Sequence, residues 1–357
     1  MKKVVSIAAL ALVFSCSGKK TEPAATGSGS GSGSAPAPAK VEPPAKGLAA
    51  KDNDPAIVAL AKEGIKCKAD GDRLEWNCDG FKAWRDSKLF EDNKGDATLT
   101  NLLEDPDEKV RSLAVDRFQH LAPKDPAQVK RMLAAAQLET STIVAEWLGR
   151  SLGAADVAKA GVAADANKLI ADSKSPELRN GLITGGASNA AYFDTILEVG
   201  NESTDVKLRH AAVEAFYNNT PEGKEADVCK MWLGNVDNAD AETAGAATSL
   251  EGRVGSCKDN YDALLDKIDA RQKNGTIANA EMVSSLHWLN DGSSATDAQK
   301  KRAIDLGKAI ASNEKLPQDA RGGAVELLAP IDATYTAKFL KDKDDYVKGV
   351  AERALKK

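Results

Sequence analysis

The chain has 357 residues and a formal net charge of −5, and 28% of its residues are charged. Residues 1–46 carry six lysines and two glutamates, so the remaining 311 residues hold 42 basic and 51 acidic side chains, a net charge of −9. Nucleic-acid backbones are bound through clustered Lys and Arg, so nucleic acid is not an expected partner of this acidic part. Its length is enough for one large core or for two domains.

The N-terminus predicts export. A positive start precedes the apolar residues 4–14, a stretch shorter than the roughly 17 to 25 residues that a membrane-spanning helix needs, and this order is typical of a secretory signal. Residues 12–15 followed by Cys16 resemble a bacterial lipobox, from which only the bulky Phe14 departs. The resemblance implies a signal peptide over residues 1–15 and a lipid on Cys16. Ordinary signal peptidase could cut at the same bond, which leaves simple secretion as the alternative.

Residues 16–46 predict a disordered linker behind that cysteine. Gly and Ser alternate strictly over residues 27–34, and Ala-Pro repeats follow, a composition typical of flexible tethers. About thirty such residues span on the order of 30 Å. The Gly-x-Gly spacing has no strand before it and no helix after it, so we interpret it as composition rather than as a nucleotide-binding loop.

Residues 47–94 predict a small N-terminal cap. Asp54 and Pro55 are typical of the first turn of a helix, and a glycine ends the short apolar run behind them. Asp70 and Gly71 then lie between two short runs, which indicates a hairpin or loop. The acids around this turn lack the alternation of a calcium-binding loop, so we interpret them as a solvated turn.

Four cysteines remain when Cys16 is set aside. An even number in an oxidising compartment favours disulfides, and pairing of chain neighbours would join Cys67 to Cys78 and Cys229 to Cys257, although three connectivities are formally open. These spacings differ from the close pairs of zinc-binding cysteines. We therefore expect disulfides, with no metal and no other cofactor.

Residues 95–357 are almost entirely helix-like, and the sequence repeats itself there. The recurring pattern begins with an apolar residue followed by a basic one. After two residues of any type comes a small or apolar residue, and after three more of any type comes a second apolar residue. Its copies start at Val110, Val144, Leu178, Leu208, Ala320 and Val347. These spacings place the apolar positions on one face of a helix. A period of about 30 to 40 residues predicts an α-solenoid of helix pairs, with a register that is weak over residues 219–316.

The repeats resemble HEAT-type, armadillo-like helical repeats, whose second helix begins with Asp or Pro followed by Val-Arg and a small residue. Residues 107–118 and 344–355 are the closest matches. The resemblance implies an all-α solenoid over residues 95–357. It also implies that the basic position braces neighbouring loops through acidic partners, a role expected here of Arg111, Arg179, Arg209 and Arg321. The alternative is that these four arginines form a basic binding ladder. The acids close to them in sequence are Asp105, Asp107, Asp205 and Asp319.

The sequence motifs of common hydrolases are missing, so no catalytic residue is predicted. The histidines do not form the H-E-x-x-H frame of zinc hydrolases, and the nucleophile elbow and the phosphate-binding loop are absent. Trp147, Trp232 and Trp288 lie among apolar helical residues, where we expect core positions. The enzyme alternative, a polysaccharide-cleaving or lyase-type enzyme on stacked helices, would require one of these rings in a closed cleft beside two carboxylates.

Solenoids commonly bind proteins or peptides on the face formed by their second helices. Positions two and six residues after the repeat starts are expected to point outward there, namely Glu146, Asn180, Thr184, His210, Glu214 and Glu326. This polar and acidic set would suit a basic or polar polypeptide. The sequence therefore predicts a membrane-tethered scaffold or adaptor of the bacterial cell envelope. Ser17 resembles the outer-membrane sorting pattern, with a periplasmic or secreted location as the alternative.

Overall fold

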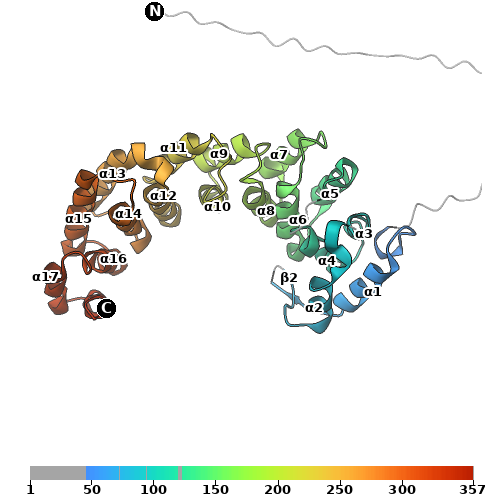
Figure 1. The fold of residues 1–357 in the computed structure, drawn as a ribbon, viewed down its shortest axis with the longest axis horizontal. Coiled ribbons are helices and arrows are strands. Elements are labelled where there is room, and N and C mark those ends of the chain that lie inside the picture. Colours follow the sequence, from blue (N-terminus) through green and yellow to red (C-terminus); the bar gives the residue numbers. More distant parts are fainter. Residues whose placement is uncertain (1–45, 72, 94, 120–122, 357) are drawn as a thin grey trace, which may run out of the picture. The chain divides into compact units, whose positions relative to one another are not determined.

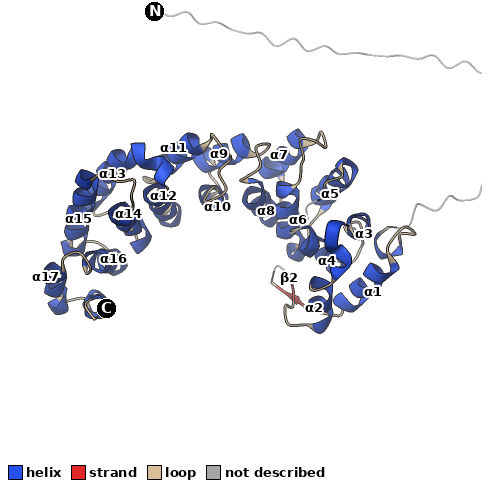
Figure 2. Cartoon of the chain, viewed as in Figure 1, coloured by secondary structure: helices blue, strands red, loops and turns tan. Residues whose placement is uncertain are grey.

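The computed structural model describes residues 46–71, 73–93, 95–119 and 123–356. The chain divides into two units, Met1–Pro43 and Pro44–Lys357. The predicted signal peptide, Cys16 and all but the last residue of the predicted linker lie outside the described residues. The described part forms eighteen α-helices, four short 3-10 helices and one two-stranded hairpin (Figure 1, Figure 2).

Short elements make up the N-terminal segment of the second unit. They are η1 (Gly47–Ala49), α1 (Pro55–Gly64), β1 (Ala69–Asp70), β2 (Arg73–Leu74), α2 (Asp79–Arg85) and η2 (Lys88–Asn93). As predicted, the Asp54 carboxylate caps α1 by accepting a hydrogen bond from the backbone N–H of Ala56 at 2.8 Å. The two strands pair antiparallel, and a disulfide between Cys67 and Cys78 closes the segment.

This segment packs on the first repeat helices. The indole N–H of Trp84 in α2 donates to the carbonyl oxygen of Leu113 at 2.9 Å, and the Lys109 ammonium donates to the carbonyl oxygen of Cys67 at 2.7 Å. Trp84 is completely buried. A large aromatic side chain that is both buried and hydrogen-bonded fixes an interface well, so the segment covers the first end of the helix stack.

The repeat region alternates first and second helices. The first helices are α3 (Asp96–Leu102), α5 (Pro126–Leu138), α7 (Ala163–Asp172), α9 (Phe193–Glu202), α11 (Glu225–Asn235), α13 (Tyr261–Asn274), α15 (Asp297–Ser312) and the short α17 (Ala333–Thr336). The second helices are α4 (Glu108–Phe118), α6 (Thr142–Ala154), α8 (Pro176–Gly186), α10 (Val206–Ala215), α12 (Ala241–Arg253), α14 (Ala280–Asp291), α16 (Gln318–Leu328) and α18 (Asp345–Ala354). Two 3-10 helices, η3 (Gly255–Asn260) and η4 (Ala337–Lys341), follow α12 and α17.

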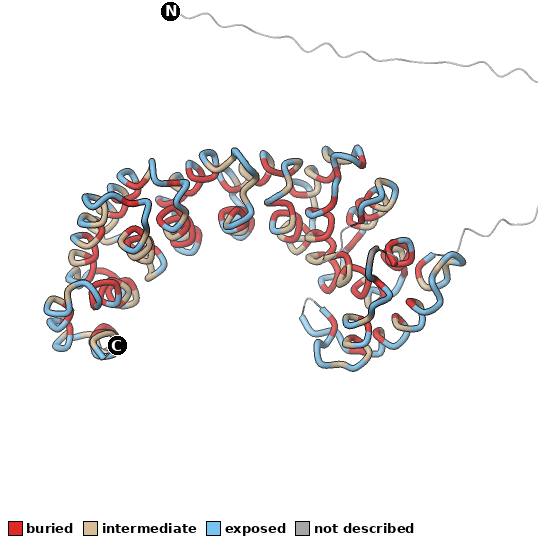
Figure 3. Tube along the Cα trace, in the orientation of Figure 1, coloured by how far each residue is buried: buried red, intermediate tan, exposed pale blue. Residues whose placement is uncertain are grey.

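Each second helix packs on the second helix of the next unit, from α4 on α6 to α16 on α18. Within the unit Pro44–Lys357, the helix pairs follow a curved path with the second helices on its inner side (Figure 1). The buried residues form a continuous band between the two layers (Figure 3). The apolar repeat positions belong to this band, since Val110, Ala114, Phe118, Val144, Leu148 and Leu152 are each 0% exposed. The predicted all-α repeat fold is confirmed.

Regular helix pairs also form over residues 219–316, where the repeat is weak in the sequence. The second helices α12 and α14 begin there at Ala241 and Ala280. The buried face of α12 consists largely of small residues, including Ala244, Ala247 and Thr248. Small residues pack two helices closely but give little apolar periodicity, which explains why the repeat was faint in the sequence.

The contact of α6 with α8 is the most extensive contact between two elements of the described chain. It depends on glycines. A Cβ atom added at Gly149 would lie 2.4 Å from the carbonyl oxygen of Leu178, and one added at Gly181 would lie 2.0 Å from that of Glu146. Backbone therefore meets backbone at this junction, and no side chain fits between the helices.

The second disulfide joins Cys229 to Cys257, with a Cα–Cα distance of 5.3 Å. Both bonds thus connect cysteines that are neighbours along the chain. Disulfides persist in oxidising environments, so the pair of bonds indicates an extracytoplasmic location. Among the described residues, no helix combines the length and the apolar character needed to cross a membrane.

Candidate functional site

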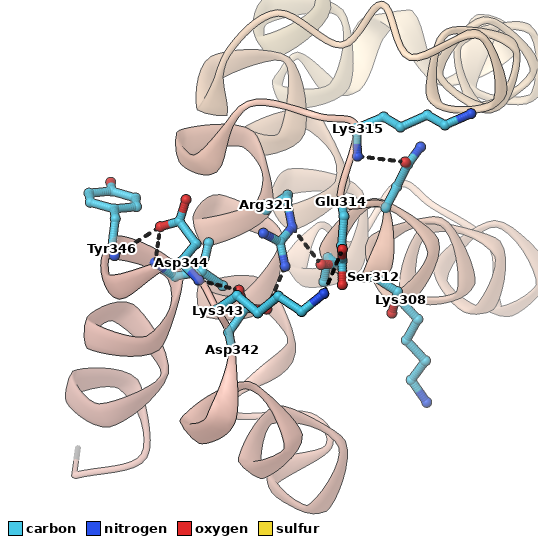
Figure 4. Close-up of polar contacts among 12 residues, drawn as sticks. Lys308, Ser312, Glu314, Lys315, Arg321, Asp342, Lys343, Asp344 and Tyr346 are labelled. Carbon is cyan, nitrogen blue, oxygen red and sulfur yellow. Dashed lines mark hydrogen bonds and ion pairs between the residues drawn. The ribbon is translucent and has the colours of Figure 1, made fainter.

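Arginines near the start of the second helices brace the junctions that position the candidate surface. Arg111 forms a bidentate pair with Glu139, with N–O distances of 2.7 and 2.9 Å. Arg321 is 5% exposed and donates to the carbonyl oxygen of Ala311 and to the Asp342 carboxylate (Figure 4). Charge-assisted hydrogen bonds of this kind fix loops at defined distances and angles.

Two further arginines act in the same way through weaker partners. Arg179 Nη1 lies 3.4 Å from Asp205 Oδ2, and Arg209 donates to the amide oxygen of Asn235 at 2.8 Å. The bracing role expected of the four arginines is present. The partners, however, lie 21 to 28 residues further along the chain, at the end of the next first helix or in the loop that follows it.

Of the four acids named from sequence proximity, Asp205 is the partner of Arg179, and Asp105 accepts a hydrogen bond from Arg111 through its backbone carbonyl oxygen at 2.9 Å. Asp107 caps α4 through the N–H of Lys109, and Asp319 accepts from the N–H of Ala280. The Asp105 carboxylate accepts hydrogen bonds from the backbone N–H groups of Leu48 in the N-terminal segment and of Asp107 before α4. The prediction was wrong for Asp107 and Asp319, because contacts between units depend on which segments stack, and sequence distance does not measure that.

Four of the six predicted surface positions line one hollow on the second-helix face. Asn180 and Thr184 come from α8, and His210 and Glu214 come from α10. The hollow has a volume of about 370 Å³. Its other lining residues are Arg150, Val206, Lys207, Ala211, Ala215, Asn219, Asp240 and Glu242.

The remaining two positions do not line this hollow. Glu146 lies on α6 and accepts a hydrogen bond from Arg150, a lining residue, at 2.7 Å. Glu326 is exposed on α16. The repeat spacing thus predicted outward-facing positions, and the stacking of α8 on α10 brings only some of them together.

His210 and three acids form the polar centre of the hollow. His210 Nε2 lies 3.4 Å from Glu214 Oε2, and this contact raises the pKa of His210 and lowers that of Glu214. The charges of Glu242 and Asp240 raise the pKa of His210 further. Hydrogen bonds from Thr243 lower the pKa of Asp240, so this carboxylate stays ionised.

Glu281 extends the acidic group from α14. Burial raises the pKa of its carboxyl, and the charges of Glu214 and Glu242 raise it further. Carboxylates that repel one another in this way attract a cation, such as the side chain of a lysine or arginine. Asp240, Glu242 and Glu281 were not predicted as site residues. They come from the region of weak register, where the sequence gave no spacing with which to place them.

The three tryptophans lie in different surroundings within the described part of the chain. Trp232 is 1% exposed and its indole donates to the carbonyl oxygen of Val213, so its predicted core position is confirmed. Trp147 and Trp288 are half-buried, so neither occupies the fully buried position that was expected, although Trp147 packs against the core. Each lies beneath a guanidinium, that of Arg150 or of Arg253.

Trp147 also lines a smaller hollow of about 170 Å³ beside the hairpin. The residues around it are Arg73, Trp76, Phe81, Arg85, Ser112, Asp116 and Gln119. This lining contains one carboxylate, that of Asp116. A pair of acids for cleaving a glycosidic bond is therefore not found in the lining of this hollow.

Comparisons with known proteins give structural neighbours and no family. No family model and no curated protein matches the chain. The chain is similar to an engineered protein of the Northeast Structural Genomics Consortium, at 16% identity and a TM-score of 0.41 over 86% of each chain. A second engineered protein from the same consortium has 14% identity and a TM-score of 0.22, over 73% of this chain and 95% of that one. A designed armadillo repeat protein has 17% identity and a TM-score of 0.20, over 72% of this chain and 97% of that one.

Proposed function

We propose that this protein is an exported, lipid-anchored scaffold or adaptor without catalytic activity, and that it binds a basic segment of a protein or peptide on its second-helix face. The observation that carries the proposal is the convergence of His210, Glu214, Asp240 and Glu242 in one open hollow. These groups come from two consecutive units of the repeat. A partner lying along the face would therefore contact several units at once.

The chemistry of the hollow favours a cationic side chain flanked by polar backbone. Glu214 and Glu242 are exposed, so a lysine or arginine could pair with them without complete loss of hydration. Asn180 and Thr184 on α8 add carbonyl and hydroxyl oxygens to the lining. The lining also contains two basic residues, Arg150 and Lys207. The charge of Arg150 is already balanced by an ion pair with Glu146.

The anchor is the second part of the proposal. A lipid on Cys16 would hold the chain at a membrane, most simply the outer membrane of the cell envelope, and the linker over residues 16–46 would keep the acidic solenoid clear of the headgroups. The two disulfides support an exported protein. An intact mass of the mature protein tests the anchor, because a lipid increment should be present in the wild type and absent from Cys16→Ser.

Binding is tested with two fluorescent decapeptides, one rich in Lys and Arg and one rich in Asp and Glu, by anisotropy at moderate salt. We expect only the basic peptide to bind, and the acidic peptide not to. The double variant Glu214→Gln, Glu242→Gln should weaken binding by about tenfold, since it removes two ion pairs of about 0.7 kcal/mol each.

The matched control is Glu198→Gln, Glu202→Gln on α9, which removes the same charge from exposed positions of the first-helix layer. It should change binding by less than twofold. Equal weakening in both double variants would mean that the peptide responds only to the net charge of the protein. Such a result would contradict a site at the hollow.

A further inference from the structure

The hollow beside the hairpin is built by two parts of the chain. Half of its lining residues belong to the N-terminal segment, and the other half belong to α4, to the residue after it, and to α6. The strand β2 contacts both of these second helices, and the Cys67–Cys78 disulfide closes the segment that carries it. The hollow therefore lies at the N-terminal end of the second-helix face, apart from the acidic hollow between α8 and α12.

Two tryptophans line this hollow with rings that are partly open to solvent. Trp76 is 49% exposed and lies between β2 and the disulfide-bonded Cys78, and Trp147 on α6 is half-buried. The ring centroid of the buried Phe81 lies 6.1 Å from that of Trp76. One exposed aromatic ring needs no explanation, but rings that share a hollow with arginines are typical of the centre of a protein interface.

Arginines stack on both tryptophan rings. The guanidinium carbon of Arg85 lies 4.2 Å from the ring centroid of Trp76. Those of Arg73 and Arg150 lie 5.6 and 5.0 Å from the ring centroid of Trp147. Stacking uses the flat faces of a guanidinium and leaves the N–H groups along its edge to donate hydrogen bonds. A carboxylate accepts two such hydrogen bonds at once, so this arrangement favours a carboxylate next to the rings.

The charges of the lining also favour an anion. The lining contains two guanidinium groups, those of Arg73 and Arg85, and one carboxylate, that of Asp116. This excess of positive charge contrasts with the net charge of −9 on residues 47–357 as a whole. Arg85 Nε also lies 3.1 Å from Oδ1 of Asp86, a carboxylate outside the lining that is 67% exposed. Ion pairs between exposed groups contribute little, so Arg85 keeps most of its attraction for another carboxylate.

The size of the hollow decides between classes of ligand. Pockets for drug-sized molecules have volumes of about 300 to 1,000 Å³. The hollow has a volume of about 170 Å³, which is enough for one side chain and too little for a whole cofactor. A sugar ring would stack on a bare aromatic face, but a guanidinium lies over each of the two tryptophans. The occupant that fits best is therefore a side chain of another protein.

We propose that this hollow binds one aromatic side chain of a protein partner, and that the partner has a carboxylate next to this ring in its sequence. The ring lies against Trp76 and Trp147, and the carboxylate accepts hydrogen bonds from Arg73 and Arg85. The site is separate from the acidic hollow and does not depend on it. Arg150 contacts Trp147 here and also lines the acidic hollow, so the two sites are neighbours on one face.

The test uses the full chain and a capped pentapeptide, Gly-Glu-Phe-Glu-Gly, whose phenylalanine carries a para-fluoro substituent. We expect its fluorine NMR signal to shift and broaden as protein is added, and the titration gives the Kd. The same peptide without fluorine should displace it, whereas Gly-Glu-Ala-Glu-Gly should not, because both the ring and the carboxylates are needed. Displacement by cellotriose and not by the unlabelled peptide would assign the hollow to a sugar and overturn the proposal.

The double variant Arg73→Gln, Arg85→Gln removes both guanidiniums of the lining. It should weaken binding of the fluorinated peptide by about tenfold. The matched control is Lys168→Gln, Lys174→Gln, which removes the same charge from exposed positions in α7 and in the loop after it. The control should change the Kd by less than twofold. Equal weakening in the two double variants, or no weakening in either, would overturn the proposal.

Trp76→Ala tests the ring separately, because it leaves every charge in place. It should weaken binding of the fluorinated peptide by at least about fivefold, and an unchanged Kd would contradict the proposal. This variant also provides the test if the arginine variant does not fold. The double variant Glu214→Gln, Glu242→Gln should leave this Kd unchanged, so a failure at the acidic hollow is distinguishable from a failure here.

Discussion

The α6–α8 junction and the junction around α12 are held together by opposite means. Between α6 and α8, the glycines at 149 and 181 allow the two backbones to touch. At α12, the Cys229–Cys257 disulfide joins α11 to η3, the segment that follows α12, and the buried carboxyl of Glu251 lies next to this bond. Because the stability of a solenoid is roughly a sum over neighbouring interfaces, each interface can be built differently. The first includes a direct approach of two backbones, and the second includes a covalent cross-link beside a buried titratable group.

The largest effect should come from removing the disulfide. In the chain-entropy model, a cross-link over a sequence separation of 28 contributes about 3 to 4 kcal/mol, so Cys229→Ala, Cys257→Ala should lower the free energy of unfolding by that amount. Urea denaturation measures the loss. Hydrogen exchange should show lost protection in α11–α13 and retained protection in α6 and α8. Unchanged protection in α11–α13 would mean that packing alone holds that junction.

The next effect is the pH dependence that Glu251 imposes. Its pKa rises from 4.5 to about 8 on folding, so the folded state keeps a proton that the unfolded state releases between these values. Stability from this group is therefore complete below about pH 4.5 and is lost as the pH rises to 8. Relative to the wild type, Glu251→Gln should gain about 3 kcal/mol between pH 5 and pH 8. Urea midpoints across that range give the difference, and a constant difference would argue against a buried protonated carboxyl.

A smaller effect is expected at the glycine junction. Gly181→Ala places a methyl group against the carbonyl of Glu146 and should cost about 2 kcal/mol through forced separation of α6 and α8. Gly234→Ala on α11 is the matched control, because nothing lies within 4 Å of its added Cβ. That variant should be neutral or stabilising by up to about 1 kcal/mol. Thermal denaturation compares the two, and similar melting temperatures would show that the close approach carries no strain.

Much of the architecture could be predicted because it is encoded locally. The apolar positions at i, i+4 and i+8, such as Val110, Ala114 and Phe118, specify helices that need neighbours on one face. The helix start at Asp54 needs only a side chain and a backbone N–H two residues away. The cysteine pairing was predictable for a similar reason, since each bond joins chain neighbours.

The candidate site was predicted only in part. The repeat period gave the outward positions of α8 and α10, including His210 and Glu214, because these helices keep a regular register. The small residues of α12 hid the next unit, so Asp240 and Glu242 could not be placed beside them. The partners of the arginines were missed for a different reason, because they lie 21 to 28 residues further along the chain, in the next unit.

By itself, the sequence determined that this chain forms a helical repeat with two local disulfides, since both follow from interactions between residues near one another along the chain. The tertiary structure alone decided which side chains meet between units. It placed Glu214 near Glu281, Arg321 on Asp342, and Glu251 against a disulfide. These contacts depend on how closely and at what angle the helices stack. Small residues set that geometry through backbone approach, and such residues leave little signal in a sequence.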